Sequence, residues 1–297
     1  MVRPVTQEDP TGIDSEFARS TSRVVATDSG TMHFHDHGDG PPLLLIHGSG
    51  PGVSGWANFA GNLATFGGSY RCLVPDLPGF GRSPAAGKSP AADAATAVIE
   101  FLDAVGVERT AIIGNSLGGG VGAQIAATHP DRVSKLVSIG GLGINLLSAA
   151  PAEGIKLLVA FMEDPTRERL VEWMHSMVYD PAIITDELVD MRFAVATRPE
   201  IHAAASRIYS RASLAFIQSS MNGRGAGARL SWLPDILAPT LLVWGRDDRV
   251  NTLDMALVPM RLIPRCELHV FYDCGHWAMI ERRLEFESTV LAFLARP

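Results

Sequence analysis

The sequence predicts an α/β protein whose core is a mostly parallel, eight-stranded sheet flanked by helices. Short apolar runs, typical of strands buried on both faces, alternate with helical patterns along most of the chain. The alternation stops between about residues 143 and 212, where the sequence indicates helices alone. Within a single domain spanning 1–297, we therefore expect a core of about 22–142 and 213–297 and an inserted helical lid of about 143–212.

The expected strands coincide with the apolar runs. The first two flank an Asp-Ser-Gly turn and form a hairpin, and the others are short runs rich in Leu, Ile and Val. The eight expected strands span residues 22–27, 31–36, 42–47, 71–76, 111–114, 133–139, 240–245 and 267–271.

The expected helices fill the intervals between the later strands and make up the insert. A helical insertion between two strands of a parallel sheet lies at one end of the sheet, where α/β active sites form, so we interpret it as a lid. The first 20 or so residues are polar, and we expect them to be loosely ordered. The expected helices span residues 91–105, 117–128, 154–162, 166–179, 185–197, 199–209, 253–262 and 277–294.

Composition excludes several classes of partner. The net charge is −7 with no cluster of Lys and Arg, so we expect no nucleic-acid binding. The three cysteines have no regular spacing, which argues against a disulfide framework or a zinc site. The chain has no run of 18 apolar residues and a polar N-terminus, so we expect a cytoplasmic protein with no membrane partner.

Three histidines alternate in the second expected strand. His33, His35 and His37 would share one face of that strand, a spacing that invites a metal site. No fourth ligand is suggested nearby, so we expect the exposed face of a hairpin strand instead. We expect no metal ion and no organic cofactor.

The segment Gly114-Asn-Ser-Leu-Gly118 fits the pattern G-x-S-x-G between an expected strand and an expected helix. In that context the pattern predicts a sharp turn that presents Ser116 as a nucleophile above the strand ends. Side chains two residues before and after the serine would clash in such a turn, which is why glycines stand there. A glycine-rich bend without chemistry remains the alternative for the pentapeptide alone.

A serine nucleophile needs a base and an orienting carboxylate, expected in the order Ser, Asp or Glu, His. His276 is the histidine in a loop after a late strand, with glycine beside it. The acid of such a site usually stands three residues after the glycine that ends its strand, which selects Asp248 over Asp247. Asp273, on the approach to the histidine, is a weaker candidate.

An attack by serine also needs two N–H donors for the oxyanion. One is the backbone N–H of Leu117, directly after the nucleophile. The other is expected from Ser49 or Gly50, in the glycine-rich loop after the strand that ends near His47.

Together these segments resemble the meta-cleavage product hydrolases of the α/β-hydrolase superfamily. The resemblance runs from about residue 22 to the C-terminus. The matching segments are HGSGPGVSGWANF at 47–59, GNSLGGG at 114–120, EGIKLL at 153–158, MRF at 191–193, WGRDDR at 244–249 and CGHWA at 274–278.

The resemblance implies cleavage of a carbon–carbon bond in 2-hydroxy-6-oxohexa-2,4-dienoates, giving 2-hydroxypenta-2,4-dienoate and a carboxylic acid in aromatic catabolism. It places Asn58, Asn115, Arg192 and Trp277 in the substrate site, with Arg192 holding the substrate carboxylate. A solvated lid arginine and a turn or helix-start role for Asn58 are the alternatives. The resemblance also implies a homodimer or a larger homo-oligomer.

Two other functions compete with this one. A carboxylesterase or lactonase would use the same triad without needing Arg192. A non-catalytic ligand-binding protein of the same fold would usually have lost a triad residue. Several apolar lid residues indicate a roomy pocket for the substituent on carbon 6 of the substrate: Leu157, Phe161, Met162, Trp173, Met174 and Met177.

Overall fold

The computed structural model describes residues 2–4, 16–85, 93–215 and 230–297. They form one mixed sheet with the strand order β1-β2-β3-β5-β4-β6-β7-β8-β9. The first three pairings along this order are antiparallel, and all those from β5 to β9 are parallel. The strands are β1 (Arg3–Pro4), β2 (Ser22–Thr27), β3 (Gly30–His37), β4 (Pro42–Ile46), β5 (Arg71–Pro75), β6 (Thr110–Asn115), β7 (Val133–Ile139), β8 (Thr240–Gly245) and β9 (Cys266–Phe271).

This sheet confirms the predicted fold class. The eight predicted strands correspond to β2 to β9, and β1 adds a two-residue ninth strand at the edge, beside β2. No helix in the described ranges is long and apolar enough to cross a membrane.

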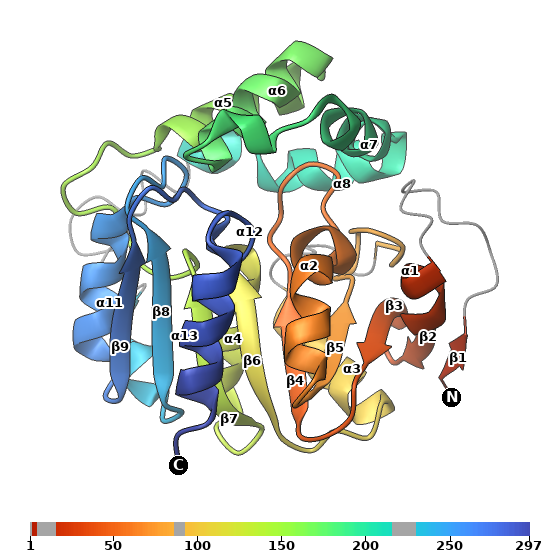
Figure 1. Cartoon of the computed structure of the whole chain (residues 1–297). Coiled ribbons are helices and arrows are strands. Elements are labelled where there is room, and N and C mark those ends of the chain that lie inside the picture. The colour runs from red at the N-terminus through yellow and green to blue at the C-terminus, as the bar shows by residue number, and fades with distance from the viewer. Residues whose placement is uncertain (1, 5–15, 86–92, 216–229) are drawn as a thin grey trace.

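Helices cover both faces of the sheet, and alternate residues of one strand reach opposite cores (Figure 1). Leu43 and Leu45 of β4 belong to the core under α2 and α13, whereas Leu44 and Ile46 belong to the core under α3 and α4. These helices are α2 (Gly55–Gly67), α3 (Ala94–Ala104), α4 (Leu117–Thr128) and α13 (Arg283–Leu294).

Helices α5 to α8 follow β7 in the chain and cover the end of the sheet at which the parallel strands finish (Figure 1). Their apolar side chains, including Phe161 and Trp173, join the core shared with α2 and α13. This arrangement places the insert directly above the ends of β4 and β6. The insert helices are α5 (Glu153–Glu163), α6 (Arg167–Met177), α7 (Asp186–Ala196) and α8 (Pro199–Ile208).

Some elements differ from the sequence predictions. The expectation of loose order was wrong for α1 (Glu16–Thr21), while residues 1 and 5–15 lie outside the described ranges. Helix α2 was not predicted, since its sequence contains three glycines, but Ser54 caps its N-terminus and its aromatic residues are buried. The predicted C-terminal helix is divided at Arg282 into α12 (Ala278–Glu281) and α13, and the segment 253–262 begins as a 3₁₀ turn before α11 (Leu257–Leu262).

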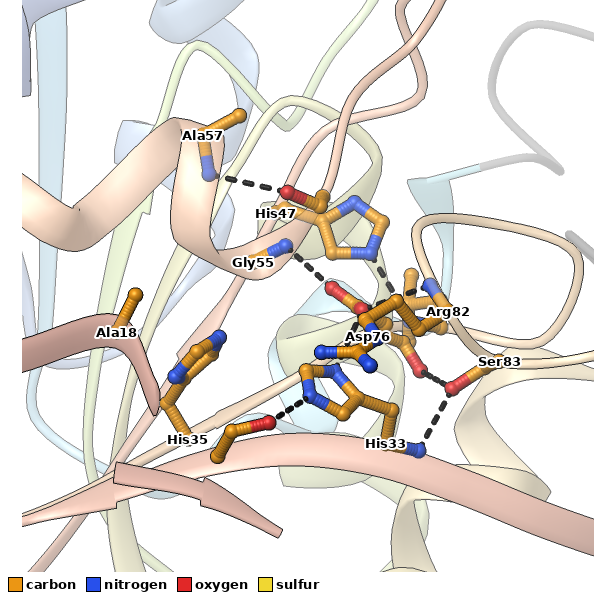
Figure 2. A network of polar contacts seen from close by, with 12 residues as sticks. Ala18, His33, His35, His47, Gly55, Ala57, Asp76, Arg82 and Ser83 are labelled. Carbon is orange, nitrogen blue, oxygen red and sulfur yellow. Dashed lines mark hydrogen bonds and ion pairs between the residues drawn. The ribbon is translucent and has the colours of Figure 1, made fainter. Parts of the chain in front are cut away.

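The histidines of β3 are not on an exposed face. His33 and His35 are buried, and His33 Nδ1 lies 2.8 Å from Asp76 Oδ2 (Figure 2). Asp76 also accepts backbone N–H bonds from Gly55 and Arg82, and Ser22 Oγ lies 2.7 Å from His33 Nε2. The exposed-face interpretation was wrong because these polar partners satisfy the imidazole inside the fold.

Asp76 is the acceptor at the centre of this network. Burial alone would raise its pKa, but the hydrogen bond and charge of His33 and the Arg82 N–H are among the interactions that outweigh burial and lower the pKa to about 2. The bond to Gly55 ties the first turn of α2, and with it the loop after β4, to the end of β5. The network therefore supports the segment that leads into the site.

Replacing Asp76 with asparagine is expected to lower the free energy of unfolding by about 3 kcal/mol, because the amide nitrogen cannot accept bonds from His33 and Arg82. The folded-state pKa of Asp76 lies below its unfolded value of 3.8. Its stabilisation of about 2 kcal/mol is therefore complete above pH 4 and is lost as the pH falls through about 2. Urea unfolding at pH 7 and across pH 2–5 measures both effects.

The matched control is Asp103→Asn, which breaks an ion pair with Arg132 in which the aspartate is 61% exposed. That variant is expected to lose less than about 1 kcal/mol. Equal losses in the two variants would contradict a special role for the buried carboxylate.

Candidate active site

Ser116 stands at the turn between β6 and α4 with φ 52° and ψ −115°, a backbone conformation that non-glycine residues rarely adopt. A Cβ atom at Gly114 would lie 2.2 Å from the Gly118 carbonyl oxygen, and one at Gly118 would lie 2.1 Å from the Ile46 carbonyl oxygen. Both positions therefore require glycine. The strained turn presents the serine hydroxyl at the ends of the strands.

His276 and Asp248 come together from the loops after β9 and β8. His276 Nδ1 lies 2.7 Å from Asp248 Oδ2, and both side chains are only 1% exposed. The other oxygen, Asp248 Oδ1, accepts the backbone N–H groups of Val250 and Asn251. With Nδ1 bonded to the carboxylate, the imidazole is held so that Nε2 can accept a proton.

The two competing acids point elsewhere. Asp247 and Asp273 both pair with the guanidinium of Arg246, at 3.2 Å and 2.9 Å. The structure therefore gives His276 a single carboxylate partner among the three aspartates considered, and it is Asp248.

One narrow cavity contains Ser116 and His276 in its wall. The loop after β4 contributes Gly48, Ser49 and Gly50, and the insert covers the opposite side. The insert therefore forms part of the wall of this cavity. The insert residues in its wall are Ile155, Leu158, Trp173, Met177, Arg192 and Tyr209.

Of the expected oxyanion donors, those in the loop after β4 lie in this wall, and Leu117 directly follows Ser116. Ser49 and Gly50 line the cavity, and Leu117 is the first residue of α4, where a backbone N–H has no acceptor within the helix. The Ser49 hydroxyl is hydrogen-bonded to the hydroxyl of Tyr209, which follows α8. Sequence reasoning missed Tyr209, because no spacing links two residues that are 160 positions apart.

His47 has a structural role beside this loop. Its Nε2 atom accepts the Leu77 N–H at 2.9 Å, so Nδ1 carries the proton that it donates to the Gly48 carbonyl. Burial lowers the pKa of His47, which is consistent with a ring nitrogen that accepts a hydrogen bond. Both ring nitrogens are therefore occupied in fixing the loop.

Arg192 is a buried cation in the wall of the cavity. It is 2% exposed, donates from Nη1 to the Pro51 carbonyl at 3.1 Å, and lies with Cζ 5.4 Å from the centre of the Trp277 ring. Burial lowers its pKa to about 10, so it remains charged at neutral pH. In the described part of the chain no carboxylate forms an ion pair with it, and its Nε–H has no partner.

The interpretation of Arg192 as a solvated lid arginine was therefore wrong. A buried charge without a counter-ion is costly unless a ligand supplies the opposite charge. The cavity is built to receive an anion.

The two asparagines hold the walls of the cavity in different ways. Asn58, in the second turn of α2, accepts the Gly48 N–H on Oδ1 at 2.9 Å, which leaves its Nδ2 without a partner. Asn115 is buried, with Nδ2 at 3.4 Å from the His276 carbonyl and 3.5 Å from the Ile139 carbonyl. Both line the cavity together with Trp277.

A second cavity of about 680 Å³ adjoins the first and shares Ile155, Tyr209 and Val250 with it. Trp173 and Met177 line the first cavity, but the other four apolar lid residues suggested by the sequence lie in neither wall and pack into the core. Those four are Leu157, Phe161, Met162 and Met174. In the described ranges no group of three or more His, Cys, Asp or Glu side chains is placed to hold a metal ion.

Comparisons with known proteins agree with this architecture. The model of the alpha/beta hydrolase fold family matches residues 41–187 and 191–283. A 2-hydroxy-6-oxononadienedioate/2-hydroxy-6-oxononatrienedioate hydrolase from a Pseudomonas species is 38% identical, over 90% of this chain and 93% of its own.

Two further relatives have related names. A 2-hydroxy-6-oxo-6-phenylhexa-2,4-dienoate hydrolase from Burkholderia cepacia is 36% identical, over 89% of this chain and 91% of its own. The crystal structure of a meta-cleavage product hydrolase from Pseudomonas fluorescens superposes with a TM-score of 0.81 at 30% identity, over 91% of this chain and 96% of that one.

Proposed function

Because the chain belongs to the α/β-hydrolase fold family and, within it, to the meta-cleavage product hydrolases, we propose that Ser116, His276 and Asp248 hydrolyse a C–C bond of 2-hydroxy-6-oxohexa-2,4-dienoate-type ring-cleavage products in aromatic catabolism. The products are 2-hydroxypenta-2,4-dienoate and a carboxylic acid. The nucleophile, base and oxyanion donors all come from residues of the chain itself.

Carbon leaves as an anion only when its electrons delocalise. The dienol gains a proton at its far carbon and loses the proton of its 2-hydroxyl group, which gives a keto form. Ser116 then attacks the ketone at carbon 6 while His276 accepts the proton of the serine hydroxyl. The N–H groups of Leu117 and of Ser49 or Gly50 stabilise the oxyanion. Collapse expels the conjugated dienolate, which takes up the proton held by His276 and becomes 2-hydroxypenta-2,4-dienoate. The neutral His276 then deprotonates a water molecule, which attacks the acyl-enzyme, and the proton returns to the Ser116 oxygen as the carboxylic acid leaves.

The observation that carries the proposal is the buried, uncompensated Arg192 in the same cavity as Ser116. A dienoate substrate brings a carboxylate that neutralises this cation, and the planar guanidinium suits a carboxylate. A neutral ester or lactone brings no such charge. The carboxylesterase alternative therefore leaves the principal feature of the cavity unexplained.

The two cavities suggest how the substrate lies. The dienoate end occupies the first cavity, with its carboxylate at Arg192 and its polar groups near Asn58, Asn115 and Trp277. The substituent on carbon 6 extends past Ile155 and Tyr209 into the second cavity. In this proposal the domain is one hydrolase core, about 22–142 and 213–297, with a lid at about 143–212.

Purified protein is expected to bleach the yellow 2-hydroxy-6-oxo-6-phenylhexa-2,4-dienoate and its 6-methyl analogue, followed by absorbance, with turnover of at least about 1 s⁻¹ for the better substrate. The ratio of the two kcat/KM values measures the space available for the substituent. Turnover of p-nitrophenyl acetate without bleaching of either dienoate would instead establish the carboxylesterase or lactonase alternative.

The proposal also includes assembly as a homodimer or a larger homo-oligomer in the cytoplasm, which rests on the sequence resemblance. Analytical ultracentrifugation of the purified protein tests the assembly, and a sedimentation coefficient matching the 31.8 kDa monomer at working concentration would contradict it.

A further inference from the structure

Four buried side-chain nitrogen or oxygen atoms in the described ranges have no hydrogen-bond partner. Three belong to residues that line the cavity of Ser116: Asn58 Nδ2, Arg192 Nε and Trp173 Nε1. All three are N–H donors. Unpaired buried donors are rare in folded proteins, and three around one cavity indicate a ligand rich in acceptor oxygens.

Trp173 differs from the other two residues because the packing of its side chain depends on its ring carbons and does not involve its N–H group. The side chain is 1% exposed on α6, and a Cβ atom at Gly50 would lie 2.5 Å from its Cη2 atom. The indole therefore covers the backbone of the loop that carries the expected oxyanion donors. That contact uses the outer carbons Cη2, Cζ2 and Cζ3 of the ring, and the N–H has no hydrogen-bond partner in the protein.

Trp173 and Arg192 contact the same short loop. Arg192 bonds to the Pro51 carbonyl, and a Cβ atom at Gly52 would lie 2.4 Å from the Arg192 carbonyl oxygen. Trp173 covers Gly50 at the other end of this three-residue stretch. A carboxylate offers about four acceptor sites on two oxygens, more than the Nε–H of Arg192 satisfies.

We propose that Trp173 is a substrate-binding residue whose indole N–H donates a hydrogen bond to the carboxylate of the dienoate, beside Arg192. This inference rests on the proposed function. It adds Trp173 to Arg192 as a second residue of the insert that donates a hydrogen bond to the substrate carboxylate. The residue then selects substrates by their anionic end and not by the substituent on carbon 6.

Trp173→Phe keeps an aromatic side chain at this position and removes the N–H, together with the outer ring that contacts Gly50. In a Ser116→Ala background, absorbance titration is expected to show about 10-fold weaker binding of 2-hydroxy-6-oxo-6-phenylhexa-2,4-dienoate. With Ser116 intact, kcat/KM for this dienoate is expected to fall about 10-fold, while hydrolysis of p-nitrophenyl acetate stays within 2-fold. Trp56→Phe, which removes a core indole outside the cavity wall, is the matched control.

A second readout uses the unaltered tryptophan and does not depend on how the variant folds. In ¹⁵N-labelled Ser116→Ala protein, one of the five indole N–H resonances, that of Trp173, is expected to move downfield when the dienoate is added. Unchanged dienoate affinity in Trp173→Phe, an equal loss on the neutral ester, or an unmoved Trp173 resonance would overturn the inference. Failure of the wild-type protein to bleach any dienoate would instead overturn the proposed function.

Discussion

Replacing Ser116 with alanine is expected to reduce kcat for dienoate hydrolysis by at least about 10⁴-fold, with the dissociation constant of the dienoate nearly unchanged. The hydroxyl forms the acyl-enzyme, and the two other hydroxyl groups in the described cavity wall, those of Ser49 and Tyr209, are hydrogen-bonded to each other. The alanine methyl group fits the positive-φ turn as well as serine does. Stopped-flow absorbance separates the binding step from the bleaching step.

Ser138 offers a matched control for this substitution. It is fully buried behind the turn, its Oγ has no partner, and it does not line the cavity. Ser138→Ala is expected to keep kcat within about 2-fold. Comparable losses in the two variants would mean that the site responds to packing near the turn and that Ser116 is not the nucleophile.

Replacing Arg192 with methionine is expected to lower kcat/KM for dienoates by 10²- to 10³-fold, or about 3–4 kcal/mol, while p-nitrophenyl acetate hydrolysis changes by less than about 3-fold. Methionine fills a similar volume and removes the charge that faces the substrate carboxylate. Steady-state kinetics on both substrates gives the two ratios from one preparation of protein.

Two further variants sharpen this test. Arg192→Lys keeps the charge without the planar fork, and it is expected to recover only part of the loss. Arg169→Met removes a cation from the exposed surface of the same insert, where Arg169 pairs with Asp164, and should leave both activities unchanged. A parallel fall on ester and dienoate in Arg192→Met would show that the arginine supports the fold of the insert alone.

The sheet was predictable because its parallel strands are buried on both faces and appear as apolar runs that turn residues delimit. β2, β7 and β8 match their predicted bounds, and the other predicted strands differ by one or two residues. α2 was not predicted, because the glycines at 55, 61 and 67 weaken helical propensity and packing compensates for them. Such tertiary packing cannot be predicted from the local sequence pattern.

For the candidate site, chain order pointed to His276 and to the loop after β8, because each follows the end of a strand and those ends meet at one edge of the sheet. The spacing from Gly245 then selected Asp248 over Asp247. The unpaired N–H of Trp173 and the bond between Tyr209 and Ser49 could not be predicted in this way. Both depend on how the insert lies over the loop after β4, and no periodicity encodes that. The burial of His33 also depends on a tertiary contact, because its partner Asp76 lies 43 residues away in the chain.

The close fit between the insert and the loop after β4 has a consequence for how such enzymes diversify. Gly50 and Gly52 are shaped against Trp173 and the backbone of Arg192, with no space for a side chain at either glycine. The insert is therefore not an interchangeable module. A chimeric protein that receives new insert helices must also receive the loop after β4 that fits them. The two segments that have to be exchanged together lie more than about 120 residues apart in the chain.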